Sequence, residues 1–479
     1  MCEKARACRF RIGNAFGKLN WGKRACAVFA LCATTAIASP AQTFTTLVNF
    51  NGTNGAQPYL MSLVQGRDGN LYGTTSVGGA NDLGAVFKVT PTGTLTTLHS
   101  FAGYPTDGAY PQAGLVLATN GNFYGTTSAG GVNDDGTVFS ITSGGTLTTL
   151  LSFDGTDGYA PYAALVQATN GNFYGTTFYG GASDACAHGC GTVFEITSGG
   201  TLTTLLSFDG TDGYGPTAAL VQATNGTFYG TTQFGGANND GTVFSITSGG
   251  TLTTLESFDG TDGQFPYGGL VQASNGNFYG TTYRFGASDY GTVFSITSGG
   301  TLTTLLSFDS TDGAYPTAAL VQATNRTFYG TTDGGGANSD GTIFSITSGG
   351  TLTTLHSFDS TDGVLPYGGL VQATNGSLYG TTFEGGTSND GTIFSLAVGL
   401  GPFVETVPTS GKVGAAVKIL GTDLTGATSV TFNGTAATFT VVSRSEITTT
   451  VPAGATTGKV NVVTPSGTLS SNVPFRVLL

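Results

Sequence analysis

The chain has 479 residues, including 78 glycines, and only 9% of its residues are charged. Its hydrophobic content of 39% is that of a folded β protein rich in turns, which excludes an intrinsically disordered chain. The formal net charge of −12 argues against nucleic acid as a partner, and the apolar runs are too short for a membrane-spanning helix.

Residues 1–41 have the features of an export signal. Seven Lys and Arg residues lie between Lys4 and Arg24, an apolar stretch starts at Ala25, and small residues suited to cleavage end at Ala41. A retained membrane anchor is the alternative, which the shortness of the apolar stretch disfavours. Cleavage would remove 7 of the 16 basic and 1 of the 28 acidic residues, leaving 9 and 27 and a net charge of −18. We therefore expect a secreted or cell-surface protein with no membrane-spanning segment in the mature chain.

A unit of roughly fifty residues is repeated seven times between Phe44 and Leu396, and a period of this size is typical of propellers and arrays. Each copy contains the runs LTTLxSF, LVQATNG, FYGTT and GTVFSIT with small variations. The Phe that ends LTTLxSF recurs at Phe50, Phe101, Phe153, Phe208, Phe258, Phe308 and Phe358.

Each copy is predicted to form four antiparallel strands. In the third copy these are residues 164–169, 173–177, 192–197 and 202–208, which are rich in Val, Ile, Thr, Phe and Tyr. Short turns that contain Gly171 and Gly199 join the first strand to the second and the third to the fourth. Four strands per copy predict an all-β chain with a seven-bladed β-propeller over residues 42–398. The Tyr of FYGTT is expected to pack between blades.

The phase of the repeat predicts how the propeller closes. The first repeated run, residues 44–50, is of the fourth-strand type, whereas the last copy ends at Leu396 with a run of the third-strand type. The N-terminal strand can therefore complete the seventh blade, which leaves no exposed sheet edge there. An open β-solenoid is the alternative, but it does not explain the split blade.

The runs LTTLxSF, LVQATNGxxYGTT and GGAxxDGTVFSIT resemble the GloVer tandem repeat of bacterial exported proteins. This resemblance covers residues 44–396 and implies a propeller-like surface protein. It implies no known activity.

Residues 402–479 have a different pattern, which resembles an IPT/TIG domain. The resemblance implies an immunoglobulin-like β-sandwich, a module that serves as a spacer or for binding in surface proteins. The regular spacing of short β runs in this segment agrees with a sandwich. The matching residues are Pro408, Gly411, Gly414, Gly421, Phe432, Asn433, Gly434, Pro452 and Gly458.

The long loops, which follow the fourth strand and join the second strand to the third, should share one face of the propeller. Their sequences differ between copies, and variation on one face of a fixed scaffold is typical of recognition surfaces. Aromatic side chains are frequent there and can stack on sugars or grip a peptide, or alternatively cap the core of the propeller. The candidate ligand-binding residues are Phe178, Tyr179, Tyr214, Phe234, Phe265, Tyr283, Arg284, Phe285, Tyr315 and Phe383.

Two further features could hold a metal ion, although a structural role is favoured for both. The repeated DGTDG loops offer Asp154, Asp157, Asp209 and Asp212 as calcium candidates, but Asp and Gly also form turns. Cys186 and Cys190 predict a loop disulfide, because an even pair in an exported protein is usually oxidised. A metal site that includes His188 is the alternative. No other cofactor is expected.

No nucleophile, zinc, phosphate or dinucleotide motif stands in a suitable context. The expected function is therefore non-enzymatic binding or adhesion by a monomeric exported protein, with an extracellular glycan or a surface protein as its partner. Two alternatives stay open, a structural envelope component and a lyase or glycosidase that acts on polysaccharide.

Overall fold

The computed structural model describes residues 42–478, so the expected signal segment 1–41 lies outside it. All regular structure in the described residues is β-strand. With no helix present, the described residues contain none that is long and apolar enough to cross a membrane.

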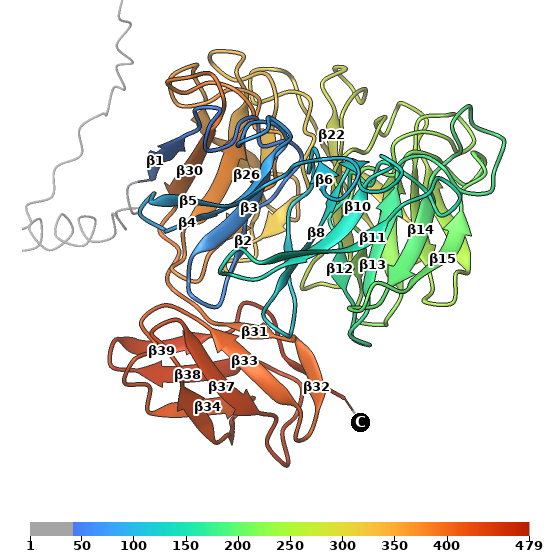
Figure 1. Cartoon of the computed structure of the whole chain (residues 1–479). Helices are drawn as coiled ribbons and strands as arrows, with labels where there is room; N and C mark the ends of the chain where they lie inside the picture. The colour runs from blue at the N-terminus through green and yellow to red at the C-terminus, as the bar shows by residue number, and fades with distance from the viewer. Residues whose placement is uncertain (1–41, 479) are drawn as a thin grey trace, which may run out of the picture. The chain divides into compact units, whose positions relative to one another are not determined.

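Residues 43–397 fold into seven four-stranded antiparallel sheets that resemble propeller blades (Figure 1). The first three sheets contain β2 (Val64–Gln65), β3 (Leu71–Thr75), β4 (Ala85–Val89) and β5 (Leu95–Ser100); β7 (Val116–Leu117), β8 (Phe123–Thr127), β10 (Thr137–Ile141) and β11 (Leu147–Ser152); and β12 (Val166–Gln167), β13 (Phe173–Thr177), β14 (Thr192–Ile196) and β15 (Leu202–Ser207).

The next three sheets follow the same order along the chain. They contain β16 (Val221–Gln222), β17 (Phe228–Thr232), β18 (Thr242–Ile246) and β19 (Leu252–Ser257); β20 (Val271–Gln272), β21 (Phe278–Thr282), β22 (Thr292–Ile296) and β23 (Leu302–Ser307); and β24 (Val321–Gln322), β25 (Phe328–Thr332), β26 (Thr342–Ile346) and β27 (Leu352–Ser357).

The seventh sheet combines both ends of the repeated region, as the phase of the repeat predicts. β28 (Val371–Gln372), β29 (Leu378–Thr382) and β30 (Thr392–Ala397) come from the last copy, and β1 (Thr43–Asn49) adds the fourth strand. β1 pairs with β30 in antiparallel register, with Phe44 opposite Leu396.

Burial within a sheet follows the amino-acid pattern of each run. β13 is buried at all five positions, and β14 is buried at all except Glu195, because neighbouring sheets cover both faces. β15 is exposed at Thr203 and Thr204 and half-buried at its other four positions, as expected of an edge strand with the sequence LTTLLS. The turn before β15 needs Gly200, because a Cβ there would collide with the carbonyl oxygen of Leu150 in the preceding sheet.

Aromatic stacking and amide hydrogen bonds join each sheet to the next. Tyr174 stacks on Phe228 of the following sheet with ring centroids 4.1 Å apart, and four other sheet pairs repeat this contact, which confirms the predicted role of the FYGTT tyrosine. The backbone N–H of Thr374 in the last copy donates to Oε1 of Gln65 in the first, at 2.8 Å. A hydrophobic cluster that includes Leu71 and Tyr379 also joins the first and seventh sheets.

Residues 405–478 form an immunoglobulin-like β-sandwich, in agreement with the sequence. One sheet has the order β31 (Glu405–Val407), β33 (Ala416–Leu420), β37 (Glu446–Thr450) and β36 (Phe439–Val441), and the other has β35 (Thr435–Ala436), β34 (Ser429–Phe432), β38 (Val460–Thr464) and β39 (Gly467–Ser470). β32 (Ser410–Lys412) pairs in parallel with β40 (Arg476–Leu478). Val417, Val430, Ile447 and Val462 from both sheets share one core.

One detail differs from the sequence prediction. The first strand of the third copy is only β12, shorter than the predicted residues 164–169, because the pairing to β13 has just two residue pairs. Two histidines in fourth strands, His99 and His356, are half-buried and contact carboxylates, with His99 Nε2 2.9 Å from Asp107 and His356 Nε2 2.8 Å from Asp362.

Candidate functional site

The two long loops of each copy are held together by a short antiparallel bridge. In the third copy the N–H of Tyr159 donates to the carbonyl of Tyr179 at 3.0 Å, and the N–H of Tyr179 donates back at 3.2 Å. In the second copy the same contact extends over two residue pairs and forms the strands β6 (Gly108–Ala109) and β9 (Ala129–Gly130). The bridge therefore recurs in every copy, whereas the side chains at the bridged positions vary.

Both bridged positions carry aromatic or long polar side chains in the third, fourth and fifth copies. Tyr159 stacks on Tyr179 with ring centroids 5.2 Å apart, and Tyr214 stacks on Phe234 at 5.1 Å. We call the bridged pairs of these three copies the rim pairs; the third pair is Gln264 and Arg284. The corresponding residues elsewhere are smaller or aliphatic except Glu384: Ala56 and Val77, Ala109 and Ala129, Ala314 and Gly334, and Val364 and Glu384.

Neighbouring copies extend this aromatic surface. The ring of Phe234 lies 5.2 Å from that of Phe265, and the guanidinium of Arg284 lies 5.4 Å from the ring centre of Tyr315. Gly215 lies between the ring of Phe178 in the third copy and the ring of Phe234 in the fourth. A Cβ on Gly215 would lie 3.0 Å from the ring of Phe178 and 3.5 Å from that of Phe234. The absence of a side chain at Gly215 therefore lets these rings approach.

A second group of aromatic residues gathers from widely separated sheets. We call Tyr59, Tyr162, Tyr267, Tyr283 and Tyr367 the tyrosine cluster; all five are half-buried. Burial raises the pKa of each, and mutual charge effects add to the shift between Tyr59 and Tyr267 and between Tyr162 and Tyr59. The ring of Tyr59 lies 5.3 Å from that of Tyr367, and Tyr267 lies 5.0 Å from Tyr283. Residues from the first, third, fifth and seventh copies therefore meet in one place.

Asp333 is the carboxyl group of this region. Its side chain is 4% exposed, and burial raises its pKa to about 8 although the positive charge of Arg284 acts in the opposite direction. Within residues 42–478 no other residue donates a hydrogen bond to this carboxyl. Its charge also contributes to the raised pKa values of Tyr59, Tyr267, Tyr283 and Tyr367, after burial.

The predicted ligand residues divide between the two groups. Tyr179, Tyr214, Phe234 and Arg284 are members of the rim pairs, with Phe265 and Tyr315 beside them. Tyr283 belongs to the tyrosine cluster, and Phe178 and Phe383 pack against it at 5.1 Å from Tyr162 and 5.2 Å from Tyr367. Phe285 is 44% exposed. Tyr214 also packs against the buried core, so the capping role weighed for these rings applies to it.

Sequence reasoning missed Tyr59, Tyr162, Tyr267, Tyr367 and Asp333. The four tyrosines share one signal, since each follows the repeated proline, where the other copies have Gln112, Thr217 and Thr317. Asp333 also has a signal in the sequence. It directly follows the GTT of its copy, and the other copies have no charged residue at this position: Ser76, Ser128, Phe178, Gln233, Tyr283 and Phe383.

The acidic loops use their carboxylates to build turns. Oδ1 of Asp154 accepts hydrogen bonds from the N–H and the hydroxyl of Thr156, at 3.0 and 2.6 Å, and Oδ1 of Asp157 accepts from the N–H of Asp154 at 3.1 Å. The Thr156 hydroxyl is the main cause that lowers the pKa of Asp154. Asp209 and Asp212 repeat this arrangement. Among the described residues no group of three His, Cys, Asp or Glu side chains is placed to hold a metal ion.

Cys186 and Cys190 form the predicted disulfide in the loop between β13 and β14. Cys190 is buried, whereas His188 is exposed with its ring 5.7 Å from that of Tyr179. The bond closes the loop insertion of the third copy, next to one rim pair.

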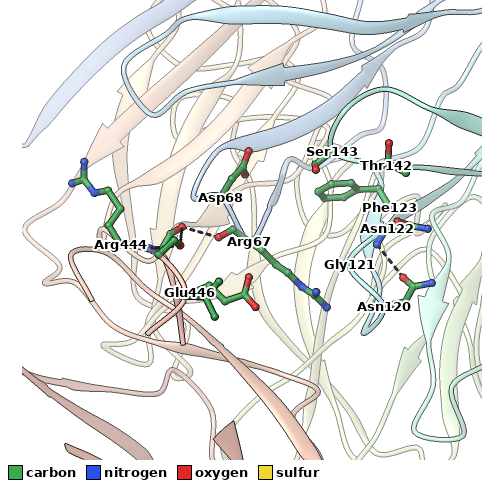
Figure 2. A pocket seen from close by; sticks show the side chains of 13 residues that line it. Arg67, Asp68, Asn120, Gly121, Asn122, Phe123, Thr142, Ser143, Arg444 and Glu446 are labelled. Atoms are coloured by element: carbon green, nitrogen blue, oxygen red, sulfur yellow. Dashed lines mark hydrogen bonds between the residues drawn. The ribbon is translucent and has the colours of Figure 1, made fainter. Parts of the chain in front are cut away.

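A cavity of about 500 Å³ lies away from both groups and is lined by polar residues (Figure 2). The hydroxyl of Ser445 donates to the carbonyl of Arg67 at 2.7 Å, and the Arg67 guanidinium donates to the carbonyl of Thr119 at 2.6 Å. Asp68 and Glu446 also line the cavity. Arg67 is thus committed to contacts within the protein on both its backbone and its side chain.

Comparisons with known proteins match both parts of the chain. Residues 33–232 and 219–439 match the Gloeobacter/Verrucomicrobia repeat, and residues 403–477 match the IPT/TIG domain. No curated protein matches the chain. Among solved structures, virginiamycin B lyase from Staphylococcus aureus is similar with a TM-score of 0.50 and 13% identity, covering 74% of this chain and 99% of the lyase. A fungal alcohol oxidase in complex with copper has a TM-score of 0.51 and 15% identity, covering 91% and 99%. Both are of propeller type, and identities this low show likeness of fold alone.

Proposed function

This chain belongs to the Gloeobacter/Verrucomicrobia repeat family, and we propose that it is an exported binding protein that holds a glycan on its long-loop face. One observation carries the proposal: the rim pairs place stacked aromatic rings in the third and fourth copies, and Gln264 with Arg284 in the fifth, on a scaffold that is otherwise repeated closely. The IPT/TIG domain fits a surface or exported protein, and the expected signal segment accounts for export.

The chemistry of the rim pairs favours a sugar. Half-buried tyrosine rings offer a flat apolar face and a hydroxyl group, which together suit the C–H face and the hydroxyl groups of a sugar ring. Gln264 and Arg284 add hydrogen-bond donors beside the rings. Successive copies would then contact successive sugars of one chain.

We also infer that the seven sheets form a closed ring of seven blades. The pairing of β1 with β30, the hydrogen bond from Thr374 to Gln65 and the shared cluster of Leu71 and Tyr379 support this inference. A variant without residues 42–50 tests it, because β30 would lose its partner strand. A closed ring predicts a lower melting temperature and self-association of the variant. Unchanged stability would contradict it.

A glycan-array screen of residues 42–479, with and without calcium, is the first test of the proposed function. Any glycan that binds is then titrated against the variants Tyr179→Ala and Tyr214→Ala. Tyr110→Ala is the matched control, because Tyr110 is exposed in the second copy and outside the rim pairs. The proposal expects at least about a tenfold loss of affinity in the rim variants alone. Absence of any glycan ligand, or equal binding by all variants, would reject it.

An enzyme that acts on polysaccharide is the second candidate, because Asp333 breaks the symmetry of the repeats. A buried carboxyl with a pKa of about 8 has the properties of a general acid near neutral pH. This candidate requires turnover of a polysaccharide that Asp333→Asn abolishes while the rim variants mainly weaken binding. Binding without turnover would leave the glycan-binding proposal in place.

A further inference from the structure

The tyrosine cluster consists of other residues than the rim pairs and lies beside a carboxyl group, Asp333. Tyr59, Tyr267 and Tyr367 occupy the same position in the first, fifth and seventh copies, and Tyr283 joins them through its contact with Tyr267. Each ring keeps part of its surface exposed. The electron-rich rings therefore remain within reach of a small molecule from solvent.

Among the described residues, Asp333 gives this cluster a carboxyl group with which no other residue pairs. Asp333 is 4% exposed, and within residues 42–478 no side chain forms an ion pair with its carboxyl group. The positive charge of Arg284 acts on Asp333, but Arg284 is exposed and its guanidinium lies over the rings of Tyr283 and Tyr315, 5.7 and 5.4 Å from their centres. A buried carboxyl without a partner is costly to the folded state.

The residues around Asp333 determine which kind of ligand could bind to its carboxylate. A calcium ion needs six or more oxygen ligands, whereas this cluster offers one carboxyl group among phenol rings. An anion would be repelled once the carboxyl ionises. An organic ammonium group satisfies both features, because its charge pairs with the carboxylate while its alkyl surface rests against aromatic faces.

We propose that the tyrosine cluster and Asp333 form a binding site for a ligand that carries an organic ammonium group. The rings of Tyr59, Tyr267, Tyr283 and Tyr367 contact the alkyl part of the cation, and the Asp333 carboxylate supplies the counter-charge. This site is independent of the glycan proposal, because it uses other residues and needs no sugar.

Choline is the first probe, because its charge does not change with pH. Binding to residues 42–479 is measured by calorimetry at about pH 6 and about pH 9, where Asp333 is mainly protonated and mainly ionised. The other charged groups near these rings are Glu384 and Arg284. Glu384 is half-buried and Arg284 is exposed, whereas Asp333 is buried. Linkage predicts that choline binds at least about tenfold more tightly at the higher pH. The neutral carbon isostere of choline, dimethylbutanol, should show no such increase.

Three variants separate the parts of the site. Asp333→Asn should remove the pH dependence and bind choline no better than the wild type does at the lower pH. Tyr267→Leu should lose affinity several-fold, whereas Tyr267→Phe keeps the ring and should bind within about twofold of the wild type. Equal affinity at both pH values, or equal binding of choline and its isostere, would overturn the proposal. That comparison uses the wild type alone, so it decides the question even where a variant fails to fold.

Discussion

Replacement of Asp333 by Asn should change how the stability of the protein depends on pH. Burial raises the pKa of Asp333 from its usual 3.8 to about 8 in the folded protein. Between these two values the unfolded chain releases the proton that the folded protein keeps. Unfolding therefore releases a proton over this range, and the free energy of unfolding falls as the pH rises from about 4 to about 8.

The size of the effect follows from the difference between the two pKa values. Each pH unit corresponds to about 1.4 kcal/mol, so ionisation of Asp333 lowers the free energy of unfolding by roughly 6 kcal/mol across the range. Solvent screening reduces this little, because the side chain is 4% exposed. Asn fits this position, since Gln233 is also buried at the equivalent place in the fourth copy.

Chemical denaturation at a series of pH values between about 4 and about 9 measures the effect. Asp333→Asn should have about the wild-type stability at the acidic end and should exceed it by several kcal/mol at the alkaline end. Asp309→Asn is the control, because Asp309 is exposed and its pKa is lowered, chiefly by the Thr311 hydroxyl, so it is ionised throughout most of the range. A constant difference between wild type and Asp333→Asn at all pH values would refute the reasoning.

Three further predictions concern stability. Asp107→Asn should lower the free energy of unfolding by about 2 kcal/mol at neutral pH, measured by denaturation, because Asp107 accepts hydrogen bonds from His99, Ala102 and Gly108. Burial acts to raise its pKa, but these hydrogen bonds lower it overall, so its contribution should be present at neutral pH and disappear as the pH falls through the lowered value. Gly158→Ala should cost about 3 kcal/mol because its Cβ would collide with Thr177, whereas Gly171→Ala, also at positive φ but with open space around it, should cost about 1 kcal/mol; equal melting temperatures would contradict this. The double variant Cys186→Ala, Cys190→Ala should lose about 2 kcal/mol in thermal unfolding, because the bond closes a short loop, and reductant should destabilise only the wild type.

Most of the fold could be predicted from the sequence because its determinants are local and repeated. The turn residue Gly171 and the apolar run of β13 act on neighbours only a few residues away, so the strands appear at the expected places. The partnership of β1 with β30 was also predictable, since the phase of the repeat leaves one strand unpaired at each end. The two-residue length of β12 was not, because pairing rather than composition limits it.

The sequence predicted most of the aromatic residues of the rim pairs but only Tyr283 of the tyrosine cluster. Tyr179 and Tyr214 stood out because their bridged positions vary between copies, and the structure places both among the rim pairs. Tyr59 and Tyr267 did not stand out, because each looks like an ordinary residue in the loop before the first strand of its copy. Their common neighbourhood exists only after the copies are brought together in space.

Asp333 shows most clearly where the sequence stops. In the amino-acid sequence, Asp333 and Asp309 are simply two acidic residues in loops of the same copy. One is 4% exposed beside tyrosines from three other copies, and the other is open to solvent and holds a turn. The amino-acid sequence alone determined the repeat, its strands and its second domain, because these depend on local pattern. Tertiary structure decided which carboxyl group is buried among aromatic rings, because burial depends on residues distant in the chain.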